Sequence, residues 1–279
     1  MTRLTDDMVK DIVGSLDTVN EMLISMTGMG RMELACDALG ISPEDIDLKG
    51  LKAASIPITS GLGVIKKFSE SVAQIAARLG MDSFVTDSPD VTGFGEAISK
   101  GSDIILMADD TTFVAYNVKA GKYANNSFCT AAGYTSALKG AAGGLSGKDV
   151  LILGAGRVGS IAAGIMYDLG ASVCIADIDP VRSKRLASAH KGMCCTKDID
   201  EAISTHGLIL NASPAHIPGH LIKKGAIIST PGIPHTFDAE GIARAGKIIH
   251  DPLDIGTSVM AVQSASFTRH ERGKTVWDE

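Results

Sequence analysis

The chain has 279 residues, 45% of them hydrophobic, and a formal net charge of −6. Its length allows two domains, and because no run of lysines or arginines marks a stripe for a phosphate backbone, nucleic acid is not an expected partner. No apolar stretch approaches the ~20 residues that span a bilayer, and residues 1–7 lack the apolar core of a signal peptide, so we expect a cytoplasmic protein without membrane contact.

Neither the cysteines nor the histidines have the spacing of a metal site. The cysteines form no CxxC pair, so we expect buried thiols without a disulfide framework at Cys36, Cys129, Cys174, Cys194 and Cys195. The seven histidines include no HExxH or other compact ligand set. The sequence therefore predicts no metal.

The first half of the chain starts with helices and then alternates strands and helices. Apolar residues at three- and four-residue steps predict one amphipathic helix from Leu4 to Met26, and Met32 to Leu39 offers a second helical stretch. Strands are then expected at 55–59, 83–86 and 103–107, with helices at 65–79 and 91–100. This alternation predicts a small parallel sheet.

A long helix and a glycine-rich stretch separate the two halves. The helix is expected over 125–142, and the glycines at 143, 144 and 147 end it. Later strands are expected at 149–153, 172–176, 207–211, 226–230 and 247–250, and a last helix over 256–264. The predicted fold class is α/β with two domains: a substrate domain over 1–143, with helices and a small parallel sheet, and a doubly wound Rossmann domain over 147–267, followed by a mobile polar tail over 268–279.

A glycine turn in the second half has the pattern of a dinucleotide site. The strand that ends at Leu153 runs into Gly154-Ala155-Gly156-Arg157-Val158-Gly159 and then into a helix. The first glycine permits the tight turn, the second lets a pyrophosphate approach the backbone, and the third lets helix and strand pack closely. Because the helix also offers its first amides to the anion, we predict cofactor contacts at Gly154, Gly156, Arg157, Val158 and Gly159.

An acidic residue and two loops complete the predicted cofactor site. Asp177 ends the next strand, 23 residues after Gly154, and a carboxylate at this spacing accepts hydrogen bonds from ribose hydroxyls and repels a 2'-phosphate, which selects NAD over NADP. The loops that follow two later strands are predicted to border the second ribose and the nicotinamide, through Asn211, Ala212, Ser213, Pro214, Thr230, Pro231 and Gly232. His235, beside the second loop, is the one histidine considered for catalysis.

Polar residues also follow the strands of the first half. Ser60 follows one strand, Asp87 follows the next, and Asp109 and Asp110 follow the third. In a parallel sheet these positions share one edge, where ligands bind. If the third strand continues through both aspartates, their side chains point to opposite faces, so only one need face a cleft.

Several blocks of the chain resemble the dehydrogenase family of the final step of pyrrolysine biosynthesis. The most specific blocks are 82–91 and 107–110, and the others are 57–61, 124–126, 229–234 and 252–257. They occur in order over most of the chain. The resemblance implies an NAD-dependent oxidation of the terminal amine of lysine-Nε-3-methylornithine, followed by loss of ammonia and closure of the pyrroline ring.

The resemblance also implies roles for individual residues. Asp109 is the residue expected to anchor the substrate amine, and it is the candidate catalytic group, as proton acceptor or as anchor alone. Together with positions in the matching blocks, the predicted substrate site is Leu4, Ile58, Ser60, Phe68, Asp109 and Ile233. The first helix is expected to close over the ligand.

Two other functions remain open on the sequence alone. One is an NAD-dependent dehydrogenase of another small amino or hydroxy acid on the same two-domain plan. The other is an NAD(H)-sensing protein without turnover. The oligomeric state also stays open, with a homodimer as the assembly considered.

Overall fold

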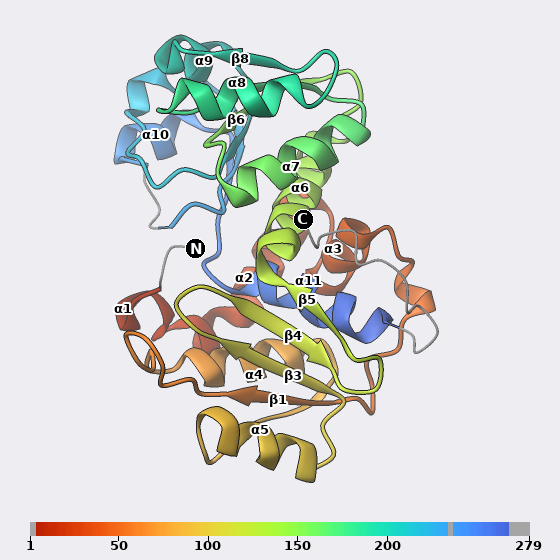
Figure 1. The fold of residues 1–279 in the computed structure, drawn as a ribbon. Coiled ribbons are helices and arrows are strands. Elements are labelled where there is room, and N and C mark those ends of the chain that lie inside the picture. Colours follow the sequence, from red (N-terminus) through yellow and green to blue (C-terminus); the bar gives the residue numbers. More distant parts are fainter. Residues whose placement is uncertain (1–3, 234–236, 268–279) are drawn as a thin grey trace.

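The computed structural model describes residues 4–233 and 237–267. Figure 1 shows one sheet in each half of an elongated molecule, with the long helix α6 (Asn126–Ala142) running from one half toward the other. The expected connecting helix is therefore confirmed. His235 and the tail over 268–279 lie outside the described residues.

The first sheet has the strand order β2-β1-β3-β4-β5. Its strands are β1 (Lys52–Ile56), β2 (Asp82–Val85), β3 (Ile104–Ala108), β4 (Phe113–Asn117) and β5 (Lys122–Asn125). The first three strands are parallel, as the alternation predicts, but β1 starts three residues before the expected strand, and β4 and β5 add an antiparallel hairpin that was not predicted. The hairpin was missed because the Asn and Thr residues near it are typical of a polar loop, whereas in the structure Phe113 and Ala115 are buried.

The helices of the first half flank this sheet. They are α1 (Asp6–Val9), α2 (Ile12–Thr27), α3 (Arg31–Leu39), the 3-10 turn η1 (Pro43–Asp45), α4 (Phe68–Arg78) and α5 (Asp90–Ser99). The prediction of one helix from Leu4 to Met26 is wrong, because a turn at Lys10 and Asp11 separates α1 from α2. Val9 and Ile12 are both buried, so the apolar pattern continues across the break and does not reveal it.

The second sheet has the order β11-β10-β9-β6-β7-β8, and all its pairings are parallel. Its strands are β6 (Asp149–Leu153), β7 (Ser172–Ala176), β8 (Cys194–Thr196), β9 (Leu208–Asn211), β10 (Ile227–Ser229) and β11 (Lys247–Ile249). The five expected strands are confirmed within one or two residues. The short edge strand β8 was not predicted as an element, and its Cys194 and Cys195 are exposed rather than buried because no further strand covers this edge.

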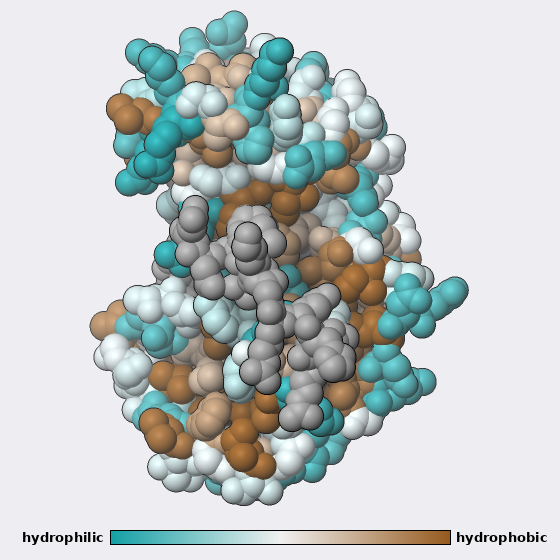
Figure 2. Space-filling model, turned by 45° about the vertical axis from the view of Figure 1, so that its right-hand side comes forward, coloured by the Kyte–Doolittle hydropathy of each residue, from teal (hydrophilic) through white to brown (hydrophobic). Residues whose placement is uncertain are grey.

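Helices between these strands complete the doubly wound arrangement predicted for the second half. They are α7 (Arg157–Asp168), α8 (Pro180–Ser188), α9 (Ile199–Thr205), the 3-10 turn η2 (Gly219–Leu221) and α10 (Ala239–Arg244). Figure 2 shows the molecule narrowing between its two halves, with apolar residues along this waist.

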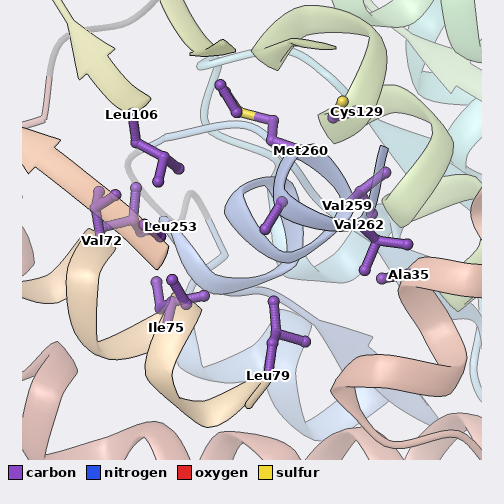
Figure 3. Packing of buried hydrophobic residues seen from close by; sticks show 14 of the residues in the cluster. Ala35, Val72, Ile75, Leu79, Leu106, Cys129, Leu253, Val259, Met260 and Val262 are labelled. Carbon is purple, nitrogen blue, oxygen red and sulfur yellow. The ribbon is translucent and has the colours of Figure 1, made fainter. Parts of the chain in front are cut away.

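The last helix, α11 (Asp254–Ser266), returns to the core of the first half. Figure 3 shows Val72 and Ile75 of α4, Leu79 just after α4, and Leu106 of β3 gathered around α11. The boundary at 143–147 remains a prediction. That prediction included α11 in the second domain, but α11 packs with the first half, because most of its buried apolar residues belong to that core. Among the described residues, no helix meets the length and apolar character needed to cross a membrane, and no cluster of acidic, His or Cys side chains could bind a metal ion.

Candidate active site

A cavity of about 440 Å³ lies where the carboxyl ends of strands from both sheets meet. Residues that follow β1 and β3 line it from the first half. The glycine turn after β6 and the loops after β9, β10 and β11 line it from the second half. Carboxyl ends of parallel strands are the usual place for ligands in α/β sheets, so the predicted substrate and cofactor loops border one space.

The glycine turn has the geometry that a dinucleotide requires. Gly154 has a φ of +95°, and a Cβ on Gly159 would lie 1.9 Å from the Gly154 carbonyl oxygen, so neither position accepts a side chain without strain. A Cβ on Gly156 would meet nothing within 4 Å, which leaves space beside the backbone for a pyrophosphate. Because α7 begins at Arg157 without a side-chain cap, its first amides can bind an anion. These residues fit NAD.

Asp177 is held beside this turn by backbone amides. Its Oδ2 accepts a hydrogen bond from the Ala155 amide at 2.6 Å, and its Oδ1 accepts one from the Asp179 amide at 2.8 Å. The carboxylate is thereby fixed at the carboxyl end of β7, where an acidic side chain meets the adenosine ribose in this type of fold. Asp177 does not line the cavity, as expected for a residue at the adenosine end of a dinucleotide.

The two loops predicted to border the nicotinamide are joined by buried polar groups. Asn211 and Thr230 are fully buried, and the Thr230 hydroxyl donates to the Asn211 carbonyl oxygen at 3.3 Å. Among the predicted cofactor residues, those that line the cavity are Gly156, Arg157, Val158, Ala212, Pro214, Pro231 and Gly232. Those that do not line it are Gly154, Gly159, Asp177, Asn211, Ser213 and Thr230.

Asp109 follows β3 and contributes a fixed carboxylate to the cavity. Its Oδ1 accepts hydrogen bonds from the Thr111 amide at 2.7 Å, the Thr111 hydroxyl at 2.8 Å and the Thr112 amide at 2.7 Å. These bonds, first among them that of the Thr111 hydroxyl, lower the pKa of Asp109 because they stabilise the ionised form. Since Oδ2 has no hydrogen-bond partner among the described residues, it can bind a cation in the cavity.

Asp110 lines the cavity as well, because the strand does not continue through the two aspartates and the condition for side chains on opposite faces is not met. β3 ends at Ala108, and the alternation of a strand does not extend to these residues. The Asp110 Oδ2 accepts a hydrogen bond from the Leu62 amide at 2.7 Å, and a Cβ on Gly61 would lie 2.1 Å from that oxygen. Asp110 therefore holds the loop that carries Ser60.

Apolar side chains form much of the remaining wall. The structure brings all six predicted substrate residues to this one cavity, namely Leu4, Ile58, Ser60, Phe68, Asp109 and Ile233. Phe68 packs edge-on against Phe113, with ring centroids 5.5 Å apart. An apolar wall with a carboxylate suits an aliphatic chain that ends in an ammonium group. The binding roles of these residues stay predictions.

Some cavity residues received no role from the sequence. They lie on α6 and just before α11, and include Asn126, Ser127, Thr130, Tyr134 and Asp251. Asp251 follows β11, so the rule that indicated Asp109, a polar residue just after a strand, could have found it. The α6 residues give no such signal, because only the packing of α6 between the halves brings them to the cavity.

Two family models match successive regions of the chain. The family model "Pyrrolysine biosynthesis protein PylD, N-terminal domain" matches residues 8–124, and the model "Alanine dehydrogenase/PNT, C-terminal domain" matches residues 120–237. Pyrrolysine synthase of Methanosarcina acetivorans is 35% identical over 263 residues, covering 93% of this chain and 98% of that protein. Pyrrolysine synthase of Methanosarcina barkeri is 35% identical over 267 residues, covering 93% and 97%. The chain belongs to the pyrrolysine synthase family.

Solved structures with the same fold include dehydrogenases. Quinate dehydrogenase from Corynebacterium glutamicum, in complex with NAD, has a TM-score of 0.54 and 14% identity over 79% of this chain and 95% of that chain. Shikimate 5-dehydrogenase from Thermus thermophilus has a TM-score of 0.53 and 16% identity over 77% and 93%. These likenesses show the α/β fold with its Rossmann half, as predicted. This member of the pyrrolysine synthase family is an NAD-dependent dehydrogenase.

Proposed function

We propose that this enzyme oxidises the terminal amine of lysine-Nε-3-methylornithine with NAD and that ammonia is lost as the pyrroline ring closes. The observation that carries the proposal is the cavity itself, where Asp109 of the first half and the glycine turn of the second half border one space. The printed name of the Methanosarcina relatives supports the choice of substrate.

The second half supplies the binding site for the cofactor. Gly156 and the first amides of α7 would hold the pyrophosphate, and Asp177 would hold the adenosine ribose. When bound, NAD supplies the hydride acceptor for the carbon that bears the substrate amine.

Asp109 binds the amine as an ammonium ion and orients it. An ionised carboxylate forms strong, charge-assisted hydrogen bonds with an ammonium group, and the lowered pKa of Asp109 keeps it ionised at neutral pH. The ammonium must lose a proton before its carbon can be oxidised. Because Asp109 is exposed, it can pass this proton to water while it keeps the nitrogen in place.

The apolar wall positions the chain that carries the amine. Leu4 and Phe68 from the first half and Ile233 from the second half line the cavity, and Leu4 is only 8% exposed. Contact with these side chains removes the substrate's methylene groups from water and limits where the reacting carbon can lie.

The direct test is incubation of the purified protein with NAD and lysine-Nε-3-methylornithine. Formation of NADH is followed by absorbance, and the product by mass. We expect one NADH and one ammonia for each pyrroline formed. Reduction of NAD with a different amino or hydroxy acid, and not with this substrate, would overturn the substrate assignment. Tight NADH binding without turnover of any amine would instead favour a sensing protein.

A further inference from the structure

Asp251 places a second carboxyl group on the wall of the cavity. It follows β11, is 7% exposed, and lines the same space as Asp109. Asp109 follows a strand of the first sheet and Asp251 follows a strand of the second, so carboxyl groups from both halves line one space.

Hydrogen bonds fix Asp251 much as they fix Asp109. The Tyr134 hydroxyl donates to the Asp251 carbonyl oxygen and accepts a bond from its amide at 2.9 Å, which holds the backbone. Oδ1 accepts bonds from the amides of Leu253, at 2.9 Å, and Asp254. Oδ2 has no hydrogen-bond partner within residues 4–233 and 237–267.

The surroundings of Asp251 oppose its ionisation. Burial and the nearby Asp254 carboxylate of α11 raise the pKa of Asp251 to about 6, while two backbone amides and Arg31 of α3 act in the opposite direction. Two other titratable groups lie nearby. Tyr134 of α6 stays protonated, because burial raises its pKa well above the ordinary value for tyrosine. The Nδ1 of His250 lies 2.9 Å from the Thr230 carbonyl oxygen. Asp251 is therefore suited to exchange protons near neutral pH, whereas Asp109 stays ionised.

A capping role alone does not explain a carboxylate at this position. Oδ1 caps the start of α11, but an asparagine oxygen would accept the same two amide bonds without the free-energy cost of burying an ionisable group. The second oxygen contributes nothing to the cap.

We infer that Asp251 carries protons between the two nitrogens of the substrate during ring closure. This inference rests on the reaction proposed above, in which the oxidised carbon bears an iminium nitrogen and a neighbouring amine attacks that carbon. Asp109 holds the departing nitrogen, and Asp251 serves the nitrogen that enters the ring.

The protons of this step balance. The attacking nitrogen enters as –NH3+ and ends as the imine –N=, so it loses three protons. The departing nitrogen enters as =NH2+ and leaves as NH4+, so it gains two, and the third proton goes to solvent. The new C–N bond forms with the lone pair of the attacking nitrogen, and the iminium π pair moves to the departing nitrogen. After the attacking nitrogen has lost a proton, its next lone pair forms the second bond of the ring C=N as the old C–N bond breaks and its electron pair leaves with the departing nitrogen. Asp251 ends in the protonation state in which it began.

The test compares Asp251→Asn with the unmodified enzyme in a single turnover quenched with borodeuteride. The quench converts uncyclised iminium into substrate with one deuterium, and pyrroline into a deuterated pyrrolidine, so mass distinguishes the two. We expect NADH to form at a rate within ~3-fold of normal while the ratio of uncyclised to cyclised product rises at least ~10-fold. An unchanged ratio would overturn the inference. If the unmodified enzyme forms no NADH at all, the proposed reaction itself fails.

Asp198→Asn is the matched control. Asp198 caps α9 by accepting a hydrogen bond from the Glu201 amide at 2.9 Å and does not line the cavity, so this variant should keep the normal product ratio. A second readout does not need turnover. In 13C spectra of aspartate-labelled protein, the resonance that disappears in Asp251→Asn should titrate near pH 6, and a resonance that titrates near pH 4 would contradict the inference.

Discussion

Asp109 is exposed, yet hydrogen bonds from Thr111 and Thr112 fix its carboxylate. Asp109→Asn keeps the size of the side chain and an oxygen for those bonds, but it removes the charge that we propose binds the substrate ammonium ion. We expect turnover to fall at least ~100-fold, with NADH affinity unchanged. Steady-state rates and NADH fluorescence titrations measure the two quantities.

Asp87→Asn is the control for this variant, because Asp87 follows β2 of the same sheet but has a side chain that is 91% exposed and does not line the cavity. It should turn over normally. Near-normal turnover of Asp109→Asn would mean that another carboxylate anchors the amine.

Asp177 is the residue predicted to determine which dinucleotide the second half prefers. Its carboxylate is fixed by the amides of Ala155 and Asp179 and would meet the 2'-hydroxyl of NAD or repel the 2'-phosphate of NADP. We expect the unmodified enzyme to prefer NAD strongly and Asp177→Ala to bind NAD at least ~10-fold more weakly. Titrations with both cofactors, together with a circular dichroism spectrum of the variant, check this, and equal use of NADP by the unmodified enzyme would contradict it.

Local signals explain which site residues could be predicted from the sequence. The glycine turn and Asp177 follow from spacing within 24 residues, and Asp109 from its place after a strand. Asp251 also follows a strand, but its raised pKa depends on burial and on Asp254 of α11, and its backbone contacts Tyr134 of α6. No sequence pattern indicates that these helices pack around Asp251, so its raised pKa could not be inferred from the sequence.

At the scale of elements, the strands of the parallel sheets could be predicted because they are short, apolar and bounded by turns. The β4–β5 hairpin could not, since no Asn-Gly or Asp-Gly turn marks it. The break between α1 and α2 was equally hidden, because Leu4, Val9 and Ile12 are buried on both sides of it. In each case the missing information is tertiary packing, which overrides the local pattern.

One buried ion pair joins two helices that are far apart in the sequence. Arg31 of α3 binds both oxygens of Asp254 of α11 at 2.5 to 2.9 Å, and the two side chains are 6% and 0% exposed. Arg31→Met would leave the Asp254 carboxylate buried without its cation. We expect the free energy of unfolding to fall by about 3–5 kcal/mol, measured by urea denaturation.

The exposed pair of Arg78 and Asp17 provides the comparison, with side chains 39% and 75% exposed. Arg78→Met should lower the free energy of unfolding by less than ~1 kcal/mol, because water replaces the lost partner. Similar effects of the two substitutions would show that Asp254 is not as enclosed as the contacts indicate.

For the whole molecule, the cavity depends on two helices that hold the halves together. α6 and α11 approach closely, since a Cβ on Gly133 would lie 2.7 Å from Ile255 Cγ2 and one on Gly256 would lie 2.7 Å from Thr130 Oγ1. Both helices start at the cavity, where Asn126 and Gly256 form part of its wall. The packing that stabilises the molecule therefore also sets the position of the two sheets around the substrate.

This link between packing and site predicts how stability depends on pH. Burial and Asp254 raise the pKa of Asp251 from 3.8 to about 6, so the folded protein binds this proton more tightly than the unfolded chain. The resulting stabilisation is complete below about pH 4 and is lost as the pH rises through about 6. At about pH 8, where Asp251 is ionised, the free energy of unfolding is therefore lower than at about pH 4 by up to about 3 kcal/mol.

The variant Asp251→Asn tests this dependence, because asparagine does not titrate. The melting temperature of the variant minus that of the unmodified protein should increase by roughly 6–12 °C between about pH 4 and about pH 8. Thermal unfolding of both proteins across this range measures the difference, and a difference that stays constant with pH would show that Asp251 is ionised in the folded protein throughout.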